Sequence, residues 1–332
     1  MRELNNEKLN SYRSVDVLIP TYRPGEKFVK LLDMLASQTV LPERVIIANT
    51  EESLFTGDAA EAFRRLNTDA SSPLYGRLSL RHITRAEFDH AGTRNLLASL
   101  SKSEAFICMT DDAVPEDCLL IEKLETALYG NGNATASAYA RQLAGKDSDE
   151  AENYTRRFNY PEEGFIKAAG DLKKLGIKLY FCPNVCCIYR RDVFEKLGGF
   201  SEPAVFNEDM VYAHAVIEAG YEIAYAADAK VVHSHNYSAM QQLHRNFDLG
   251  MSQALHPEVF GNVRSEGEGI RLVKETTLYL IKKGKLFSVP GMLVKSAFKY
   301  LGYKLGKNYG KLPDAAVLKL TMNRSFTEKY II

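Results

Sequence analysis

The sequence lacks several features that would assign the protein to a class at once. No run of about 18 apolar residues, the length that crosses a bilayer, occurs in the chain of 332 residues. The N-terminal residues contain no apolar core of signal-peptide type, and we therefore expect a cytoplasmic protein. There are five cysteines, and the cluster of Cys182, Cys186 and Cys187 shows neither a disulfide pattern nor a fourth ligand at zinc-finger spacing.

Several common nucleotide-binding signatures are also absent. No G-x-G-x-x-G fingerprint follows the first predicted strand, and no P-loop occurs. The first loop has a single glycine, Gly25, which argues against the glycine- and lysine-rich triphosphate loop of a nucleotidyltransferase. Two adjacent acids, Asp111 and Asp112, are not followed by the threonine that a phosphatase of the haloacid dehalogenase type carries.

The formal net charge is zero only when it is summed over the whole chain. The 42 basic and 42 acidic residues cancel, but residues 271–332 carry 13 Lys and Arg against 3 Asp and Glu. Residues 1–270 are correspondingly acidic, so a basic tail follows an acidic body. We expect an anionic partner for the tail, and its apolar content indicates an anionic membrane surface and no nucleic acid.

The basic tail has the periodicity of an amphipathic helix. Apolar residues recur at i, i+3 and i+4, and lysines lie off that arc. Such a helix suits an anionic membrane surface, while a basic helix packed on the folded domain, with solvated lysines, is the alternative. The apolar arc consists of Val294, Ala297, Phe298, Leu301 and Leu305, and the lysines are Lys295, Lys299, Lys304 and Lys307.

Strand-like and helix-like segments alternate along the first 130 residues. Short apolar runs, typical of buried strands, are followed by segments with apolar residues at helical spacing. This alternation predicts an α/β fold with a mostly parallel sheet, flanked by helices, whose loops share a cleft at one edge. The predicted strands are 15–19, 44–48, 78–83 and 106–109, and the predicted helices are 28–35, 58–66, 89–100 and 116–129.

Beyond residue 133 the alternation is broken. Residues 142–170 are polar without a clear period, as in a lid, an acceptor-binding loop or a disordered segment. We assign residues 1–240 to a catalytic domain and residues 241–332 to a helical, membrane-associating C-terminal region. The further predicted strands are 134–141, 181–189, 223–225 and 230–232, and the further predicted helices are 191–199 and 210–219.

Two carboxylates end a strongly apolar predicted strand, residues 106–109. Asp111 and Asp112 follow it at the carboxyl edge of the sheet, where ligands bind in open α/β folds. The two acids predict a site for a cation and a diphosphate. An acidic turn, with Asp112 capping the next helix, is the alternative for an isolated pair of this kind.

Five motifs occur in a recognisable order. They are VDVLIPTYRP, FDHAGTRN, MTDDAVP, the block YRRDVFEKLGGF with FNEDMVYAHAVIEAGY, and HSHNYS with Gln241 and residues 245–250. In this order the chain resembles the inverting nucleotide-sugar glycosyltransferases of family 2, which have the GT-A fold, and most closely their bacterial rhamnosyltransferase branch. The resemblance covers about residues 15–250 and implies a nucleotide-sugar donor and a glycan or lipid-linked acceptor.

The resemblance implies a divalent cation, Mg²⁺ or Mn²⁺, that offsets the charge of the leaving diphosphate. Asp112 is the expected ligand, and Asp111 lies nearer the ribose or the metal. The family's usual third acid is replaced by Ala113, and we expect His233 and His235 to complete the ligand set, since imidazole binds Mn²⁺. Two histidines hydrogen-bonded in a loop are the alternative.

The acids Glu208 and Asp209 match the family's Glu-Asp pair at the start of a helix. Direct displacement needs a base at the acceptor hydroxyl, and we assign it to Asp209 with Glu208 as the second candidate. Capping of the helix N-terminus would also explain both acids. Arg94, at the start of another helix, is expected to bind the diphosphate, with a surface ion pair as the alternative.

Further donor contacts are expected where the first two predicted strands end and in two other segments. The ends of neighbouring parallel strands meet at one edge of the sheet, so their polar residues can surround one ligand. The candidates are Pro20, Thr21, Arg23, Asn49 and Glu51 for the base and ribose, His90 and Asn95 beside Arg94, and Tyr237, Gln241 and Arg245 over the phosphates.

The predicted function is metal-assisted transfer of L-rhamnose from dTDP-rhamnose onto a lipid-linked or growing bacterial cell-surface polysaccharide. The enzyme would lie peripherally on the inner face of the plasma membrane. The alternatives are a UDP-hexose or UDP-N-acetylhexosamine transferase and a non-catalytic glycan-binding protein on the same fold. The sequence leaves open whether the protein forms a homo-oligomer.

Overall fold

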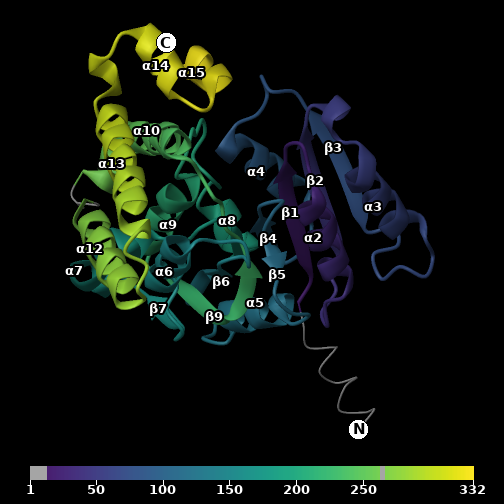
Figure 1. Cartoon of the computed structure of the whole chain (residues 1–332). Coiled ribbons are helices and arrows are strands. Elements are labelled where there is room, and N and C mark those ends of the chain that lie inside the picture. The colour runs from purple at the N-terminus through teal and green to yellow at the C-terminus, as the bar shows by residue number, and fades with distance from the viewer. Residues whose placement is uncertain (1–12, 262–265) are drawn as a thin grey trace.

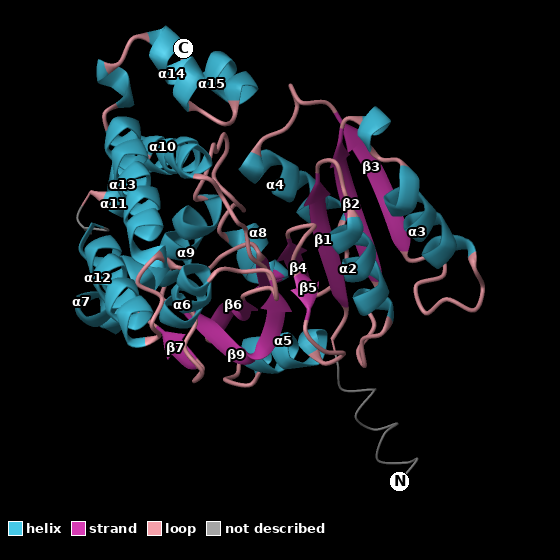
Figure 2. Ribbon diagram, viewed as in Figure 1, coloured by secondary structure: helices cyan, strands magenta, loops and turns pink. Residues whose placement is uncertain are grey.

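A nine-stranded sheet forms the centre of residues 13–261 and 266–332, the part of the chain that the computed structural model describes (Figures 1 and 2). The N-terminal residues 1–12, on which the signal-peptide prediction rests, lie outside this part. The strand order is β3-β2-β1-β4-β8-β6-β9-β5, and β7 pairs with β9. The strands are β1 (Val15–Thr21), β2 (Arg44–Thr50), β3 (Leu78–Ile83), β4 (Ala105–Met109), β5 (Val114–Pro115), β6 (Thr135–Leu143), β7 (Phe165–Lys167), β8 (Cys186–Arg190) and β9 (Glu222–Val232).

Most strands of the sheet run in one direction. β1 is parallel to β2 and β4, and β2 is parallel to β3. β8 is antiparallel to both β4 and β6, so β6 and its parallel neighbour β9 return to the direction of β4. The predicted mixed, mostly parallel α/β sheet is therefore confirmed, and the carboxyl ends of six strands meet at one edge.

Consecutive residues of the central strands enter two different cores, because side chains alternate across a strand. Val17 and Ile107 join the core on one face, and Leu18 and Phe106 join the core on the other. Burial on both faces explains the continuous apolar runs of these strands. One face is covered by α2 (Glu26–Ala36), α3 (Gly57–Thr68) and α5 (Leu120–Tyr129), and the other by α4 (His90–Leu100), α8 (Arg191–Lys196) and α9 (Glu208–Glu218).

Three predicted element boundaries were wrong. The helix predicted at 116–129 begins at Leu120, because Val114 and Pro115 form β5 and pair with the end of β9. The strands predicted at 223–225 and 230–232 are one strand, β9, whose register shifts opposite Ala140 and Arg141 of β6. The strand predicted at 181–189 begins only at Cys186.

The polar segment 142–170 contains regular structure that its sequence did not reveal. Helix α6 (Glu150–Asn159) begins after Asp149, whose side chain accepts a hydrogen bond from the backbone amide of Glu152. No residue of α6 is fully buried, and only Ala151, Tyr154 and Phe158 follow an apolar helical spacing, which is a weak signal in so polar a segment. Contact of Tyr154 with Tyr279 of a C-terminal helix, with ring centroids 4.8 Å apart, holds α6 in place.

The C-terminal residues form a layer of helices on the side of the molecule away from β3 (Figure 1). This confirms the predicted helical extension, whereas the division into domains at residue 240 stays a prediction. α10, α14 and α15 share a small core of their own with residues before α9. The helices are α10 (Ala239–Leu255), α11 (Pro257–Phe260), α12 (Glu266–Lys282), α13 (Ser288–Lys307), α14 (Asp314–Leu320) and α15 (Arg324–Tyr330), and the short α7 (Leu172–Leu175) precedes them in the chain.

Helix α13 packs on α10 through glycines. A Cβ atom at Gly302 would lie 2.1 Å from the carbonyl oxygen of Leu243, and one at Gly306 would lie 2.0 Å from the carbonyl oxygen of Phe247. Only glycine permits so close an approach of two helix backbones. The contact of α13 with α10 is therefore made through this pair of glycines, and Leu305 of the predicted apolar arc packs against the neighbouring small core.

Part of the apolar arc of α13 remains on the surface. Val294 is 52% exposed and Leu301 is 48% exposed, and Phe287 at the start of the helix is fully exposed. The helix therefore combines a face packed on α10 with an exposed apolar face. None of the helices in the described residues has the length and apolar character needed to cross a membrane.

Candidate functional site

The loops after β4 and β9 meet at the carboxyl edge of the sheet. β5 pairs with the end of β9, with Val114 opposite Val232. This pairing brings Asp112, just before β5, next to His233, just after β9. Lys27 of α2 reaches the same point, and its Nζ lies 3.8 Å from Oδ2 of Asp112.

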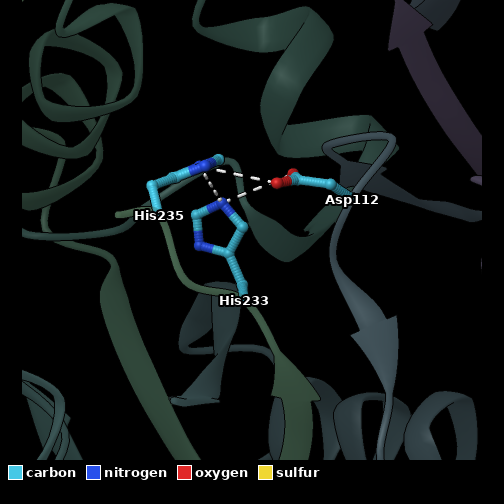
Figure 3. A group of neighbouring side chains, drawn as sticks. All are labelled: Asp112, His233 and His235. Carbon is cyan, nitrogen blue, oxygen red and sulfur yellow. Dashed lines mark hydrogen bonds and ion pairs between the residues drawn. The ribbon is translucent and has the colours of Figure 1, made fainter. Parts of the chain in front are cut away.

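Asp112, His233 and His235 point toward one another (Figure 3). Oδ1 of Asp112 lies 3.4 Å from Nε2 of His233, and Oδ2 lies 3.5 Å from Nε2 of His235. The two Nε2 atoms are 3.0 Å apart, which is also hydrogen-bond distance between the rings. Of the residues predicted as metal ligands, these three are brought together, and Asp111 is not part of the group.

Gln142 at the end of β6 fixes the orientation of His233. Its Oε1 lies 3.0 Å from Nδ1 of His233 and accepts a hydrogen bond from Nη1 of Arg156 at 2.5 Å. Because Arg156 can only donate, the amide atom between the two must be the oxygen. Nδ1 of His233 therefore carries its proton, and Nε2 presents a lone pair toward Asp112.

The protonation states of the trio suit a metal ion. Burial lowers the pKa of His233, and burial together with the neighbouring His233 lowers the pKa of His235 to about 4. Burial alone would raise the pKa of Asp112, but the neighbouring His233, His235 and Lys27 bring it well below its usual range. One carboxylate and two neutral imidazoles form a ligand set that fits Mn²⁺.

Asp111 turns toward the end of β1. Its Oδ2 accepts a hydrogen bond of 2.5 Å from Oγ1 of Thr21, so two residues predicted for the donor are in direct contact. Burial raises the pKa of Asp111 to about 6, and the charge of Asp112 adds to this rise, although the Thr21 hydrogen bond opposes it. Asp111 is thus part of the link between β1 and β4.

Glu208, the first acid of α9, is buried in an ion pair. Its Oε1 lies 3.1 Å from Nη1 of Arg94, and both side chains are 7% exposed. Nδ2 of Asn184 donates a second hydrogen bond to the same oxygen at 3.0 Å. Burial alone would raise the pKa of Glu208, but the charge of Arg94 lowers it. Arg94, predicted to bind the diphosphate, is therefore engaged with Glu208.

Asp209, the second acid, is held by backbone amides and forms no ion pair with any residue that the structure describes. Its Oδ2 accepts from the amide of Asn184 at 3.1 Å, and its Oδ1 accepts from the amide of Met210 at 2.7 Å. Burial and then the charge of Glu208 raise the pKa of Asp209 to about 7. A carboxyl group of this pKa can exchange a proton near neutral pH, as a general base requires.

Three loops at the same edge contain unusual backbone conformations. Arg23, Glu51 and Asn207 have φ values of 54°, 67° and 61°, and within residues 13–261 and 266–332 they alone have a positive φ without being glycine. They lie after β1, after β2 and directly before α9. Left-handed conformations of this kind are unfavourable for most side chains and cluster at functional sites.

The loops after β2 and β3 are tied together. Asn49 is fully buried, its Nδ2 donates to the carbonyl oxygen of Glu51 at 2.9 Å, and it lies 3.1 Å from Nδ1 of His82. Oε1 of Glu51 accepts from the backbone amide of Arg85 at 2.7 Å. Pro20, the remaining predicted residue of this edge, lies in β1 and is half-buried.

His90 and Asn95 lie on α4 behind the acid pair. The ring of His90 lies 6.1 Å from that of Phe206, and burial lowers the pKa of His90 to about 4. Nδ2 of Asn95 donates to the carbonyl oxygen of Phe200 at 2.8 Å and to Oε1 of Glu202 at 2.6 Å. Asn95 is therefore used to hold the loop that follows α8.

Aromatic stacking extends the site toward α10. The ring of Tyr237 stacks on that of His235 at 4.8 Å. The guanidinium of Arg245 lies 4.7 Å from the ring centroid of Phe206 and 5.7 Å from that of Tyr237. Gln241 forms reciprocal hydrogen bonds with the N-cap serine of α10, so it has a capping role.

The family model for glycosyl transferase family 2 matches residues 16–198, which is more than half of the chain. The chain belongs to glycosyl transferase family 2. The matched range contains Asp111 and Asp112, whereas Asp209 and the two histidines of the trio lie beyond it. The membership identifies this glycosyltransferase as an enzyme, which sets aside the non-catalytic alternative.

Curated relatives match this glycosyltransferase over nearly its full length. The O-antigen chain rhamnosyltransferase RfbN of Salmonella typhimurium is 34% identical, and the O-antigen chain rhamnosyltransferase WbaN of Salmonella anatum is 36% identical. Each alignment covers 94% of this chain and 95% of the relative. The predicted resemblance to family 2 and to its bacterial rhamnosyltransferase branch is confirmed.

Solved structures of low identity share the fold of the glycosyltransferase. The mannosyltransferase PcManGT of Pyrobaculum calidifontis, in complex with GDP-Man and Mn²⁺, has a TM-score of 0.53 at 15% identity and covers 96% of this chain and 88% of its own. TarS 1-349 of S. aureus, in complex with UDP-GlcNAc, has a TM-score of 0.50 at 11% identity and covers 90% and 91%. These structures confirm the GT-A architecture.

Four residues that support the site of the glycosyltransferase escaped the sequence analysis. Gln142 contacts His233 and accepts a hydrogen bond from Arg156. Asn184 contacts both acids of α9, and Lys27 contacts Asp112. Only Gln142 carried a readable signal, because it lies near the end of a predicted strand whose carboxyl end could share the edge of the sheet. Arg156 lies in α6, which has no fully buried residue, and Asn184 lies in a loop. Lys27 lies on the exposed side of α2.

Proposed function

We propose that this glycosyltransferase moves L-rhamnose from dTDP-rhamnose onto a lipid-linked or growing bacterial cell-surface polysaccharide, with inversion at the anomeric carbon. The observation that carries the proposal is the similarity to two O-antigen chain rhamnosyltransferases, at 34% and 36% identity over 94% of the chain. Donor choice depends on contacts from many segments, so similarity along the whole chain supports a shared donor better than one motif does.

The donor binds along the carboxyl edge of the sheet in this proposal. Asp112, His233 and His235 would hold Mg²⁺ or Mn²⁺, and this cation would offset the charge of the leaving diphosphate. Arg245 is the proposed protein ligand of the phosphates, because it lies beside Tyr237 and forms no ion pair with any described residue. Arg94 is less suited to this role, since Glu208 already occupies its guanidinium.

Asp209 is the proposed base. Its carboxylate takes the proton of the acceptor hydroxyl while that oxygen attacks the anomeric carbon from the face opposite the diphosphate. The new carbon–oxygen bond forms as the bond to the diphosphate oxygen breaks, and the nucleoside diphosphate leaves with the electron pair. Glu208 is held as an ion pair by Arg94 and contributes by raising the pKa of Asp209.

Donor identity can be tested by melting curves with dTDP-rhamnose, UDP-glucose and UDP-N-acetylglucosamine, each with and without Mn²⁺. A ligand that binds only the folded state raises the melting temperature, by an amount that grows with its concentration above Kd. We expect the largest rise with dTDP-rhamnose and Mn²⁺, followed by transfer of labelled rhamnose to a lipid-linked glycan. A rise with the UDP sugars alone would contradict the rhamnose proposal.

The exposed apolar face of α12 and α13 is the proposed membrane contact. Phe287, Val294 and Leu301 on α13 and Ile270 on α12 are between 48% and 101% exposed. Lysines of the basic tail lie on the same two helices, which suits an anionic bilayer surface. The protein would then work as a peripheral enzyme at the membrane where a lipid-linked acceptor is available.

Vesicle flotation tests this contact without removing packed helices. Replacing Phe287, Val294 and Leu301 together by serine should reduce binding to phosphatidylglycerol vesicles and leave the melting temperature nearly unchanged, because all three are exposed. Tyr75→Ser, which removes a residue 56% exposed near β3, is the control and should bind as the unchanged protein does. Equal flotation of the triple variant would contradict the proposed contact.

A further inference from the structure

A cavity of about 940 Å³ opens beside the trio and continues between α6, α10, α12 and α13. Pockets of about 300–1,000 Å³ accept ligands of drug size or larger segments of amphiphiles. At one end the lining includes His235 of the trio and Met210, the residue after the proposed base Asp209. The cavity therefore reaches the trio at His235 and comes within one residue of the proposed base.

The other end of the cavity is apolar and reaches the surface. Ile270 of α12 and Leu293 and Tyr300 of α13 line it and are 68%, 44% and 54% exposed. These residues belong to the same two helices as the proposed membrane contact. A hydrocarbon chain in the cavity could thus pass between α12 and α13 toward a bilayer.

The acidic residues of the cavity already have partners. Asp149 accepts a hydrogen bond from the amide of Glu152 and lies 3.3 Å from Nζ of Lys295. Glu152 forms an ion pair with Arg156 at 2.7 Å. Glu150, the third acid, accepts from the hydroxyl of a tyrosine on α12 at 2.9 Å.

Lys274, which is exposed, and Lys299, which is half-buried, both line the cavity without an ion pair to any described residue. The more buried of the two is Lys299. It lies on α13 one turn beyond Lys295. Burial lowers its pKa, and the charge of Glu152 only partly opposes this. A half-buried ammonium without a counter-ion is unfavourable in the free protein and becomes favourable when an anion binds next to it.

We propose that this cavity binds the lipid end of the acceptor, a phosphate or diphosphate group on a hydrocarbon chain, with Lys299 as the ligand of the phosphate. The proposal rests on the function proposed above and adds the place and chemistry of acceptor binding. The sugar end of the acceptor then points to His235 and Asp209, and the hydrocarbon leaves along Ile270 and Leu293.

Binding of farnesyl diphosphate, measured by calorimetry with saturating dTDP and Mn²⁺ in the donor site, tests the proposal. We expect measurable binding that Lys299→Gln weakens by about 10- to 100-fold, the usual range for one lost charge-assisted hydrogen bond. Lys299→Met, which keeps the aliphatic stem, should give the same loss. Neither variant should lower the melting temperature, because each removes an unmatched charge.

Lys307→Gln is the matched control, since it makes the same change on α13 at a residue that does not line the cavity. It should bind farnesyl diphosphate as the unchanged protein does. Inorganic diphosphate and farnesol, which carry only one half of the probe, should each bind more weakly than farnesyl diphosphate. Full-strength binding by the Lys299 variants, or inorganic diphosphate binding as tightly as the complete probe, would overturn the proposal.

Failure of this proposal is distinguishable from failure of the proposed function. If the cavity does not bind an amphiphile, dTDP-rhamnose with Mn²⁺ still raises the melting temperature. If the donor is another nucleotide sugar, farnesyl diphosphate still binds and Lys299→Gln still weakens it. The two measurements therefore report on separate parts of the molecule.

Discussion

Nη1 of Arg94 lies 3.1 Å from Oε1 of Glu208, in an ion pair whose two side chains are 7% exposed. This contact joins α4 to α9 directly beside Asp209. It offsets the charge of Glu208, so Asp209 is the acid of the pair that has no ion-pair partner within residues 13–261 and 266–332. The same contact engages Nη1 of Arg94, the residue predicted to bind the diphosphate.

Arg94→Gln should lower the free energy of unfolding by about 3–5 kcal/mol, because it leaves the carboxylate of Glu208 buried without its cation. Urea denaturation gives the value. The double variant Arg94→Gln with Glu208→Gln removes both charges and should recover a large part of the loss. Equal destabilisation by the single and double variants would show that the ion pair itself is not the cause.

Asp209→Asn should lower kcat by about 10²- to 10⁴-fold, the usual contribution of a positioned general base. The amide keeps an oxygen that can accept from Asn184, so the fold and the affinity for the donor should change little. Rates of sugar transfer and the melting-temperature shift with dTDP-rhamnose separate the two effects. A variant with nearly the original rate would remove Asp209 from the role of base.

The rate of transfer should rise with pH through about 7 and then level off. Burial and the charge of Glu208 raise the pKa of Asp209 to about 7, and a base works only in its ionised form. Below this pH the group is protonated and cannot take the proton of the acceptor. The remaining activity of Asp209→Asn should lack this inflection, and its persistence would assign the titration to another group.

Gln142→Ala should weaken Mn²⁺ binding by about 10- to 100-fold, although Gln142 is not itself a proposed ligand. Its Oε1 holds the proton on Nδ1 of His233 and so directs Nε2 into the trio. Mn²⁺ titration followed by electron paramagnetic resonance gives the affinity. Gln38→Ala, which removes another buried amide far from the trio, should leave it unchanged.

Gly302→Ala should destabilise the protein by about 1–3 kcal/mol, as overpacking does, because its Cβ atom would lie 2.1 Å from the carbonyl oxygen of Leu243. Gly291→Ala, on the same helix, meets no atom within 4 Å and should stabilise by up to about 1 kcal/mol through helix propensity. Thermal unfolding of both variants measures the difference. Equal effects would show that α13 does not rest on α10 through its glycines.

Features set by neighbouring residues could be predicted from the sequence. The run 106–109 is apolar because both faces of β4 are buried, and it is followed at once by the acids of the edge. Asp89 caps α4, the helix predicted at 89–100, and its side chain accepts from the amide of Gly92 within one turn. Motif order indicated the family, which the comparisons confirm.

Features that depend on contacts between residues far apart in the sequence could not be predicted. Periodicity tells which side of a helix is apolar and leaves open what covers it, so the sequence could not decide whether the apolar arc of α13 meets a membrane or packs on the domain. Helix α6 has no fully buried residue and is held by α12, and only three of its residues, Ala151, Tyr154 and Phe158, follow an apolar helical spacing. Strand pairing of β5 with β9, and not spacing along the chain, brings Asp112 to His233.

The sequence by itself determined the α/β class, the family and the residue types at the edge of the sheet, because these depend on local patterns. Only the tertiary structure decided which other groups are partners: Glu208 for Arg94 and Thr21 for Asp111. Hydrogen bonds and ion pairs act over about 3–4 Å, and residues far apart in the chain come within that distance only once the sheet has formed.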